Sequence, residues 1–330
     1  MSSSPRISVL MTVYNRETMV ANAIRSILAQ DFTDFEFVIV DDGSTDRTAA
    51  VVGAFADPRI RLVSLPVNCG IAMGRNVGLK CVRGDFVATM DSDDIAMPAR
   101  LRRQYEFFQA NPGIDIAGTN IIKVDGDRRT EQKHAPDDGT IKARLLVLEG
   151  VAMIDPTTMM RSAFLRRTGL QYPNERTDLD QALWIEATAQ GARFAVVEEF
   201  LMEYYRHPGN ITHELSPDHA GHQQRKTPLR ARLVGLFYPS LTHEEALAIA
   251  RWMEVGRTHT VVDVCAAVTA IRKALLDATS HWGESKDELA RILNAHFGRA
   301  MRALASAGRQ DPAGGTRTGA HNAPEASAPA

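Results

Sequence analysis

Two apolar segments of this chain run directly into clusters of carboxylates. Val38–Val40 is followed by Asp41-Asp42, and Phe86–Met90 is followed by Asp91-Ser92-Asp93-Asp94. Because ligands bind just beyond the carboxyl ends of the strands in an open α/β sheet, acids at two such ends are expected to line a single crevice. Acids this close repel one another, and a divalent cation is the usual partner that stabilises them. Since Mg²⁺ prefers one or two carboxylates together with substrate phosphates, the pattern predicts a site for a cation and a nucleoside diphosphate.

The elements that must position these acids alternate in type along the first third of the chain. From Ile7 to about Gly118, short apolar runs alternate with helical stretches, which is typical of a doubly wound, mostly parallel α/β sheet. Strands are expected at 7–13, 35–40, 60–65, 85–90 and 114–118, and helices at 17–29, 45–56, 71–82 and 98–109. Further along, we expect strands near 156–160 and 200–205, and a helix over 179–190 that ends at Gly191.

Length and composition indicate two units. The 330 residues are 44% hydrophobic, enough for one large core or two modest ones. We expect an α/β domain over 1–216, a helical region over 217–307 and a disordered tail over 308–330 that is poor in large apolar side chains. In the helical region, Thr242 with Glu245 and Ser285 with Glu288 have capping-box spacing. An apolar stripe there predicts a buried helix face formed by Val261, Val264, Cys265, Val268, Ile271 and Leu275.

Charge and cysteine content exclude several classes of protein. A formal net charge of −2 provides no broad basic field, so we expect no nucleic-acid partner. The three cysteines, Cys69, Cys81 and Cys265, lack metal-ligand spacing, and we expect them to be reduced and buried. We expect neither a signal peptide nor the ~20 apolar residues of a membrane span. The expected location is therefore cytoplasmic, with peripheral contact at the inner face of a membrane left open.

Several short motifs follow one another between residues 7 and 213. They are Val13-Tyr14-Asn15-Arg16, Val40 to Asp46, Asn68-Cys69-Gly70 with Arg75-Asn76-Val77-Gly78, Asp91 to Asp94, Asp180 with Trp184, and Tyr205 to Asn210. In this order and spacing they make the chain resemble glycosyltransferases of family 2, the large inverting group with the GT-A fold. The resemblance implies transfer of a sugar from a nucleotide-diphosphate sugar, UDP-linked in preference to GDP- or TDP-linked, to an acceptor hydroxyl. The implied acceptor is a saccharide or a lipid-linked saccharide, in the synthesis of surface polysaccharide or glycoconjugates.

The turn from Asp91 to Asp94 resembles the metal motif of this family. The resemblance implies that Asp91 touches the ribose and that Asp93 holds Mg²⁺ or Mn²⁺ on the diphosphate, with Asp94 in support. Because Asp91 and Asp93 lie two residues apart on a tight turn, both can face the same crevice. The resemblance also implies that His207 lies near the diphosphate, where it ligates the metal or donates to a phosphate.

The residues that the resemblance implies for the nucleotide follow the first two strands and the Gly70 turn. A carboxylate of the Asp41-Asp42 pair is expected to accept a hydrogen bond from the base or the ribose. Groups around Tyr14 are expected to reach the base. Arg75 is expected either beside a phosphate or as a structural counter-charge. The full nucleotide set is Thr12, Tyr14, Asn15, Asp41, Asp42, Arg75 and Asp91.

An inverting transfer needs a base that takes the proton from the acceptor hydroxyl as it attacks the anomeric carbon. The resemblance implies that Asp180, four residues before Trp184 on a helix, is this base. The chain departs from the usual acid pair here, because Leu179 precedes Asp180 and Ala182 follows it. Asp178 is therefore the alternative base.

Two other functions stay open at this point. Asp91-Ser92-Asp93 after an apolar strand also resembles the nucleophile motif of haloacid-dehalogenase-type phosphatases, which would make Asp91 the nucleophile. Against this, the strand is the fourth in the chain, and the nucleotide-side motifs would have no role. The third reading is a catalytically inactive nucleotide-binding protein on the same fold, motivated by Leu179 and Ala182.

Overall fold

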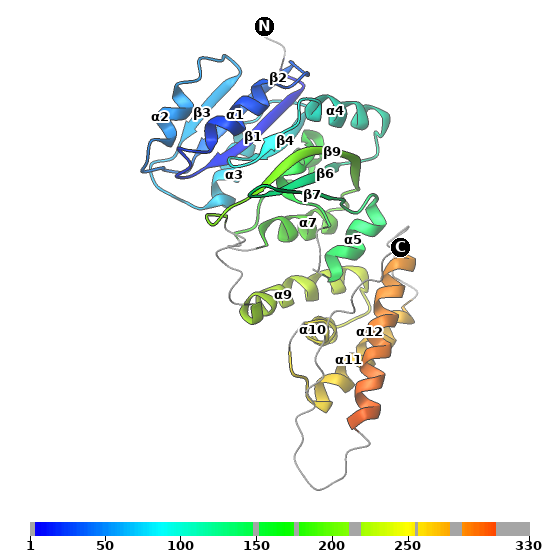
Figure 1. The fold of residues 1–330 in the computed structure, drawn as a ribbon. Helices are drawn as coiled ribbons and strands as arrows, with labels where there is room; N and C mark the ends of the chain where they lie inside the picture. Colours follow the sequence, from blue (N-terminus) through cyan, green and yellow to red (C-terminus); the bar gives the residue numbers. More distant parts are fainter. Residues whose placement is uncertain are drawn as a thin grey trace. The chain divides into compact units, whose positions relative to one another are not determined.

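The computed structural model describes residues 4–147, 152–174, 178–210, 219–254, 257–277 and 286–307 (Figure 1). The chain divides into two compact units, the first formed by Met1–Ile141 and Val151–His213 and the second by Lys142–Gly150 and Glu214–Ala330. The expected domain boundary after residue 216 lies close to the later of these divisions, whereas no sequence signal pointed to the separation of 142–150. The expected tail at 308–330 and the expected cap at Ser285 lie outside the described residues.

Within the described residues, the first unit contains one nine-stranded sheet in the order β3-β2-β1-β4-β8-β6-β9-β5, with β7 paired to β6. The strands are β1 Ile7–Val13, β2 Phe35–Asp41, β3 Ile60–Ser64, β4 Phe86–Asp91, β5 Ile95–Ala96, β6 Ile116–Asp125, β7 Arg128–Gln132, β8 Met159–Arg161 and β9 Phe194–Arg206. β1 to β4 pair in parallel, as do β6 and β9, and β8 joins the two groups by antiparallel pairing with β4 and β6. The predicted doubly wound, mostly parallel sheet is confirmed.

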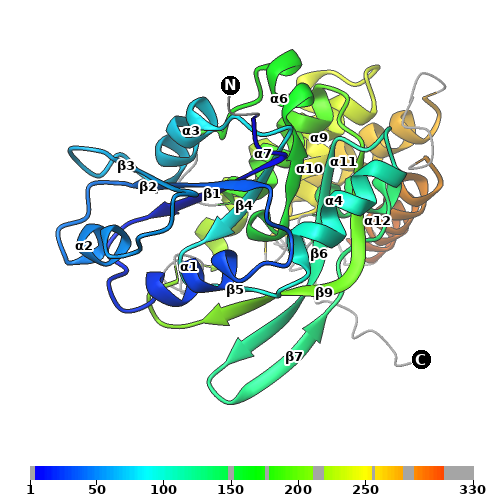
Figure 2. The ribbon, with the colours of Figure 1, turned by 90° about the horizontal axis from the view of Figure 1, so that it is seen from above.

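Helices cover both faces of the parallel part of the sheet. Alternate residues of β1, Ile7, Val9 and Met11, pack in one core cluster with α1 (Val20–Leu28), while Leu10 belongs to a second cluster with Leu79 of α3 (Ile71–Cys81). Figure 2 shows α1 and α2 (Thr48–Gly53) on one side of these strands and α3 on the other. Strands covered on both faces must be apolar almost throughout, which explains the apolar runs in the sequence.

Two glycines bring α3 close to β1. A Cβ atom added at Gly78 would lie 2.2 Å from Cδ1 of Leu10, and one at Gly74 would lie 2.6 Å from Cγ2 of Thr12. Since real Cβ atoms essentially never approach other heavy atoms so closely, any larger residue at these positions would require the helix or the side chain of Leu10 or Thr12 to shift. Arg75, between the two glycines, is thereby held next to the ends of the strands.

The remaining elements of the first unit differ in part from expectation. They are α4 Arg100–Ala110, a 3₁₀ turn at Asp155–Thr157, α6 Ser162–Thr168 and α7 Leu179–Ala189, with α5 Asp138–Val147 at the division between the units. The helices expected over 98–109 and 179–190 are confirmed within two residues. β5, β7 and α5 were not anticipated, and β9 begins at Phe194 instead of residue 200. β7 is exposed along most of its length, so it lacks the apolar alternation that a sequence search relies on.

The second unit consists of helices where it is described: α9 His219–Phe237, α10 His243–Trp252, α11 Val261–Leu275 and α12 Lys286–Ala307. The predicted capping box of Thr242 with Glu245 is confirmed, and Thr260 with Asp263 forms a second one that begins α11. None of the described helices combines the length and apolar character needed to cross a membrane.

The predicted buried stripe of α11 is right only in part. Val264 and Ile271 are buried, but Val261 is 46% exposed and Cys265 is exposed, because the packed face turns toward Ala267, Ala270 and Ala274. The prediction of buried cysteines is also wrong, since Cys69 is exposed as well and Cys81 is half-buried. Small alanines were overlooked because they carry a weaker hydrophobic signal than valine or cysteine.

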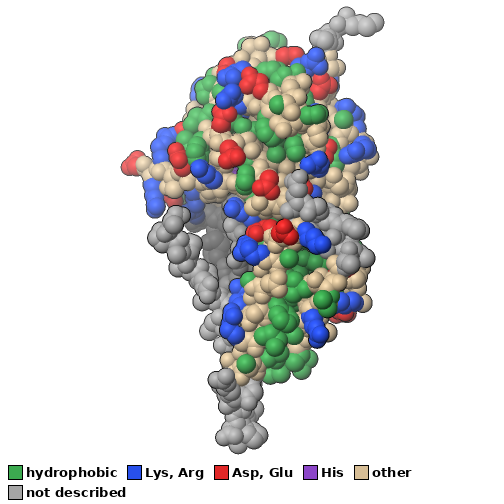
Figure 3. Space-filling model, turned by 90° about the vertical axis from the view of Figure 1, so that its right-hand side faces the viewer, with side chains coloured by type: hydrophobic (Ala, Val, Ile, Leu, Met, Phe, Trp, Pro, Cys, Tyr) green, Lys and Arg blue, Asp and Glu red, His purple; other side chains and the backbone are tan. Residues whose placement is uncertain are grey.

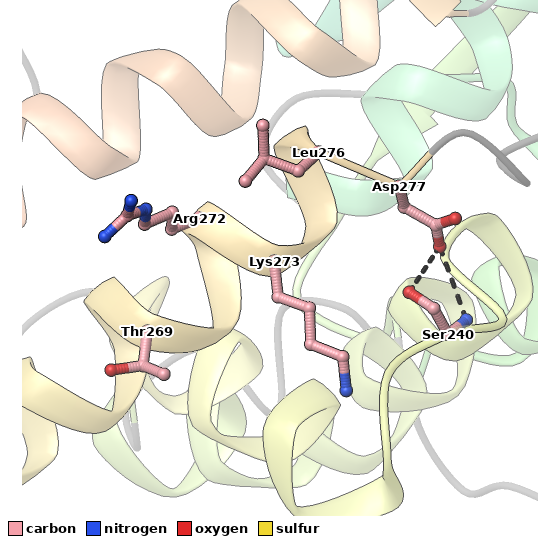
Figure 4. A pocket seen from close by; sticks show the side chains of 6 residues that line it. All are labelled: Ser240, Thr269, Arg272, Lys273, Leu276 and Asp277. Atoms are coloured by element: carbon pink, nitrogen blue, oxygen red, sulfur yellow. Dashed lines mark hydrogen bonds between the residues drawn. The ribbon is translucent and has the colours of Figure 1, made fainter.

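The surface of the second unit carries exposed apolar side chains and a shallow depression. Val262 and Leu276 on and after α11 are highly exposed, and Figure 3 shows hydrophobic side chains gathered between Lys and Arg side chains on one face of this unit. The depression, of about 540 Å³, is lined by Ser240, Thr269, Arg272, Lys273, Leu276 and Asp277 (Figure 4). Asp277 accepts hydrogen bonds from the hydroxyl and backbone amide of Ser240 there.

Candidate active site

The two acid clusters lie at the same edge of the sheet. β1 is paired with β2 on one side and β4 on the other, so that Val13 lies opposite Asp41 and Thr12 lies opposite Asp91. Neighbouring strands are about 4.8 Å apart, which places the ends of β2 and β4 two strand spacings from each other. The predicted convergence of carboxylates from separate strands is confirmed.

The turn after β4 brings three carboxylates together. Ligand oxygens of Asp91, Asp93 and Asp94 all lie within 4.8 Å of one another. Asp94 is fully buried; its Oδ1 accepts from the backbone amide of Tyr205 at 2.9 Å, while its Oδ2 finds no hydrogen-bond partner among the described residues. A buried carboxylate oxygen without a donor is costly in a protein interior, and a hard cation would satisfy it. The donor set therefore fits Mg²⁺ or Mn²⁺.

The pKa shifts of the acids at this turn also favour a bound cation. Burial, reinforced by repulsion from Asp93 and Asp155, raises the pKa of Asp91 to about 6 even though Arg75 lies beside it. Burial and then Asp91 and Asp93 raise the pKa of Asp94 well above its usual range. The carboxylates are crowded enough to resist full ionisation, and a bound cation would reverse that resistance.

His207 contacts the acid cluster through Asp93. Its Nε2 lies 3.0 Å from Oδ2 of Asp93, and its Nδ1 accepts from the backbone amide of Gly209 at 3.2 Å. Because Nδ1 is an acceptor, the proton of the neutral ring is on Nε2 and points at Asp93. In this arrangement His207 orients Asp93, and it would ligate a metal through Nε2 only after that proton had moved.

Arg75 is the counter-charge of the site. It is almost fully buried, donates from Nη2 to Oδ1 of Asp91 at 2.5 Å, and forms an ion pair with Asp155 through Nη1. Tyr172 completes the arrangement, because its hydroxyl donates to Asp155 at 2.8 Å and its ring lies 5.1 Å from the guanidinium carbon. Asp155 and Tyr172 were missed as site residues. The only signal in the sequence was an acid placed directly before Pro156 and an apolar strand.

Asp41 and Asp42 have different surroundings. Asp42 accepts from the backbone amides of Cys69 and Gly70 at 2.8 and 2.9 Å, so it holds the turn that begins α3. Asp41 accepts from the amide of Ser44 at 3.1 Å through one oxygen. The geometry thus gives Asp42 a structural role, and its expected nucleotide contact stays a prediction.

The loop after β1 is shaped by Asn15. This residue has φ of +49°, and its side-chain oxygen accepts from the amide of Thr45 at 2.8 Å, which ties the loop to the turn after β2. Tyr14 is 39% exposed at the edge, and the buried hydroxyl of Thr12 finds no partner among the described residues. Asn15 is therefore engaged in the scaffold, whereas Tyr14 presents an open ring.

Asp180 lies in the first turn of α7, and Asp178 occupies the N-cap position of that helix with φ of +55° and no capping hydrogen bond from its side chain. Burial first, then repulsion from Asp155 and Asp178, raises the pKa of Asp180 to about 6, although the amide of Gln181 donates to it at 2.8 Å. The influence of Asp155 places Asp180 in the same group of charges as Arg75 and Asp91. Trp184, fully buried and donating to the carbonyl of Met153 at 3.2 Å, anchors the helix.

The comparisons with known proteins agree with this geometry. The family described as glycosyl transferase family 2 matches residues 8–169. TuaG of Bacillus subtilis (strain 168), whose name assigns it to teichuronic acid biosynthesis as a glycosyltransferase, is 32% identical over 204 residues, or 61% of this chain and 79% of TuaG. The chain belongs to glycosyl transferase family 2. ExoO of Rhizobium meliloti (strain 1021), a succinoglycan biosynthesis protein, is 34% identical over 229 residues, which are 65% of this chain and just under two thirds, 65%, of ExoO.

Two solved structures superpose on most of the chain. S. aureus TarS 1-349 in complex with UDP-GlcNAc gives a TM-score of 0.61 at 21% identity, covering 92% of this chain and 91% of that one. Mannosyltransferase PcManGT from Pyrobaculum calidifontis, in complex with GDP-Man and Mn²⁺, gives 0.53 at 17% identity, covering 92% and 88%. At these identities the likeness shows the fold, which is GT-A-like. This glycosyltransferase is an enzyme, and the phosphatase and inactive-protein readings are not retained.

Proposed function

We propose that this family 2 glycosyltransferase is an inverting, metal-dependent enzyme that moves a sugar from a nucleotide-diphosphate sugar to an acceptor hydroxyl. The observation that carries the proposal is the cluster of Asp91, Asp93 and Asp94, with its unpartnered buried oxygen, at the same sheet edge as Asp41. The complexes of the structural neighbours with UDP-GlcNAc and GDP-Man support a nucleotide-sugar donor, and we place UDP first.

In this proposal Asp93 and Asp94, with Asp91 beside the ribose, would hold Mg²⁺ or Mn²⁺. The cation would offset the charge that develops on the leaving nucleoside diphosphate. Arg75 keeps Asp91 in place, His207 keeps Asp93 in place, and Asp41 with the exposed ring of Tyr14 binds the nucleoside.

Asp180 is the proposed base. The acceptor oxygen attacks the anomeric carbon from the face opposite the diphosphate, the bond from that carbon to the phosphate oxygen breaks, and the hydroxyl proton passes to Asp180. A carboxyl with a pKa of about 6 is suited to this work, because it is ionised at neutral pH and still accepts a proton readily. Asp178 remains the alternative base.

The acceptor that we propose is a saccharide or a lipid-linked saccharide in polysaccharide or glycoconjugate synthesis. The names of ExoO and TuaG, which refer to succinoglycan and teichuronic acid, support this class.

The proposal is tested by measuring the melting temperature with UDP- and GDP-sugars, each with Mn²⁺ and with EDTA. A ligand that binds only the folded protein raises the melting temperature, and we expect at least one donor to do so only with the metal. The same donor should be turned over with release of its nucleoside diphosphate, and Asp93→Asn should abolish both effects. No stabilisation by any nucleotide sugar, or full activity in EDTA, would overturn the proposal.

A further inference from the structure

Arg16 joins three parts of the candidate site that are distant in sequence. Its backbone amide donates to Oγ1 of Thr48 at 2.8 Å, and its Nη2 donates to the carbonyl of Gly209 at 2.8 Å. Its Nε lies 3.7 Å from Oδ2 of Asp93, the same oxygen that His207 contacts. The guanidinium is therefore fixed by a backbone carbonyl of the turn after β9 and lies next to the proposed metal ligand.

The contact of Arg16 with Asp93 is an attraction between charges without a hydrogen bond. At 3.7 Å the two atoms exceed hydrogen-bond distance, whereas Arg75 reaches Asp91 at 2.5 Å. The Nε of Arg16 thus lies beside Asp93 without donating a hydrogen bond to it. Such a donor is available to an anion that enters beside Asp93.

Two other arginines near the acid cluster are already engaged by groups of the protein. Arg75 is enclosed by Asp91 and Asp155, and its side chain is 10% exposed. Arg100 is fully buried and donates to the carbonyl of Thr89 and the side chain of Gln104. The side chain of Arg16, at 25% exposure, is more open to a ligand than either of these.

The turn at 207–210 prepares the orientation of Arg16. Asn210 donates to the carbonyl of Tyr205, the amide of Gly209 donates to His207, and the carbonyl of Gly209 receives Arg16. A guanidinium is a planar fork of donors suited to phosphate oxygens, and one that is already oriented loses less freedom on binding.

We propose that Arg16 is a further donor-binding residue, which exchanges the Asp93 carboxylate for a phosphate oxygen when the metal and the nucleoside diphosphate bind. The proposal rests on the proposed function and gives a role to Arg16, a member of the Val13-Tyr14-Asn15-Arg16 motif for which the resemblance implied none. It has two consequences. Arg16 stabilises the bound diphosphate, and in the absence of nucleotide it competes with the cation for Asp93.

The test is isothermal calorimetry on the full chain with two probes, Mn²⁺ alone and UDP or GDP in the presence of Mn²⁺. For Arg16→Ala we expect the affinity for the nucleoside diphosphate to fall roughly tenfold or more, as for a lost hydrogen bond to a charged group. The affinity for Mn²⁺ alone should rise, because the competing positive charge is gone. Arg16→Lys keeps the charge without the fork, and its nucleotide affinity should lie between those of the wild type and Arg16→Ala.

The matched control is Arg47→Ala. Arg47 is an exposed arginine directly before α2, and its hydrogen bonds among the described residues come from its backbone amide and carbonyl alone, so removal of its side chain should alter neither affinity. Circular dichroism checks that each variant is folded. If Arg16→Ala is not folded, the test uses Arg16→Lys instead.

Three outcomes separate the inference from the proposed function. An unchanged nucleotide affinity in Arg16→Ala would overturn the inference alone. Loss of affinity for both probes would also overturn it, because Arg16 would then act only on the structure of the site. Failure of the wild type to bind UDP or GDP with Mn²⁺ would instead overturn the proposed function.

Discussion

The backbone amide of Tyr205 donates a 2.9 Å hydrogen bond to Oδ1 of Asp94, a residue 111 positions earlier in the chain. This bond attaches the end of β9 to the acid cluster after β4. The two carboxylate oxygens of Asp94 therefore have different roles. Oδ1 is held by the backbone, and Oδ2 is left for a cation. Asp94 is therefore fixed before any ligand binds.

Asp94→Asn should separate the structural part of this residue from its metal-binding part. The amide oxygen can still accept from Tyr205, but an NH₂ group replaces the free oxygen and cannot bind a cation. In EDTA the melting temperature should stay the same or rise, because an acid that burial and its acidic neighbours make costly to ionise is removed. The rise produced by Mn²⁺ with UDP or GDP should fall by more than half. Asp125→Asn, at an exposed acid paired with Arg206, is the control and should respond like the wild type.

Asp180→Asn should mainly reduce turnover. A general base contributes about 10²- to 10⁴-fold to rate, so kcat should fall within that range while the donor KM changes little. The measurement is release of nucleoside diphosphate under saturating donor. Asp178→Asn is the neighbouring control. Retained turnover in Asp180→Asn together with loss in Asp178→Asn would move the base to Asp178.

Activity and stability should both depend on the ionisation of Asp180. Its pKa is about 6, so kcat/KM should rise with pH through this value as the base becomes ionised. Stability should change in the opposite direction. Between the usual pKa of 3.8 and about 6 the folded state holds a proton that the unfolded state has lost, so the free energy of unfolding falls as pH rises through this window.

The same link between the pKa of Asp180 and the free energy of unfolding predicts a second effect of Asp180→Asn. Above pH 6 the variant should be more stable than the wild type by up to about 3 kcal/mol, and the difference should vanish at pH values below 3.8. Urea unfolding at several pH values measures this. A difference that does not vary with pH would show that the side chain, and not its charge, is responsible.

Tyr172→Phe should weaken the arrangement around Arg75 by removing a hydrogen bond to its ion-pair partner, Asp155. The variant keeps the ring beside the guanidinium but removes the hydroxyl that donates to the buried Asp155. Leaving a buried carboxylate without one of its donors costs about 1–3 kcal/mol of the free energy of unfolding. Tyr105→Phe is the matched control, because Tyr105 packs against Phe32 and Phe86 through its ring, and it should cost less than about 0.5 kcal/mol. Equal costs would contradict the role of the Tyr172 hydroxyl.

Gly78→Ala should push α3 away from β1. Its Cβ would lie 2.2 Å from the buried side chain of Leu10, and such overpacking costs about 1–3 kcal/mol. At Gly53, by contrast, a Cβ would have no neighbour within 4 Å. Gly53→Ala should therefore stabilise the protein by about 0.4–1 kcal/mol through the unfolded chain. Denaturant unfolding of the two variants should give shifts of opposite sign.

The elements from β1 to β4, and α4 after them, could be predicted from the sequence because each has a local pattern of its own. Buried parallel strands appear as short apolar runs, as at Ile7–Val13, and helices fill the intervals between them. The carboxylates after β2 and β4 were equally visible, since they follow those runs directly. β7 and the buried face of α11 were not predicted, because exposed side chains and alanines leave little hydrophobic pattern.

The amino-acid sequence alone determined the family, the type of sheet and the carboxylates at its edge, because these depend on residues that are neighbours along the chain. Tertiary structure decided which of them work together. It placed Tyr172 and Asp155 around Arg75, gave Asp42 to the α3 turn, and brought Arg16 to Asp93 beside the turn after β9. Such contacts join segments that are far apart in sequence, and they arise only when the strands have taken their order and the helices have packed against them.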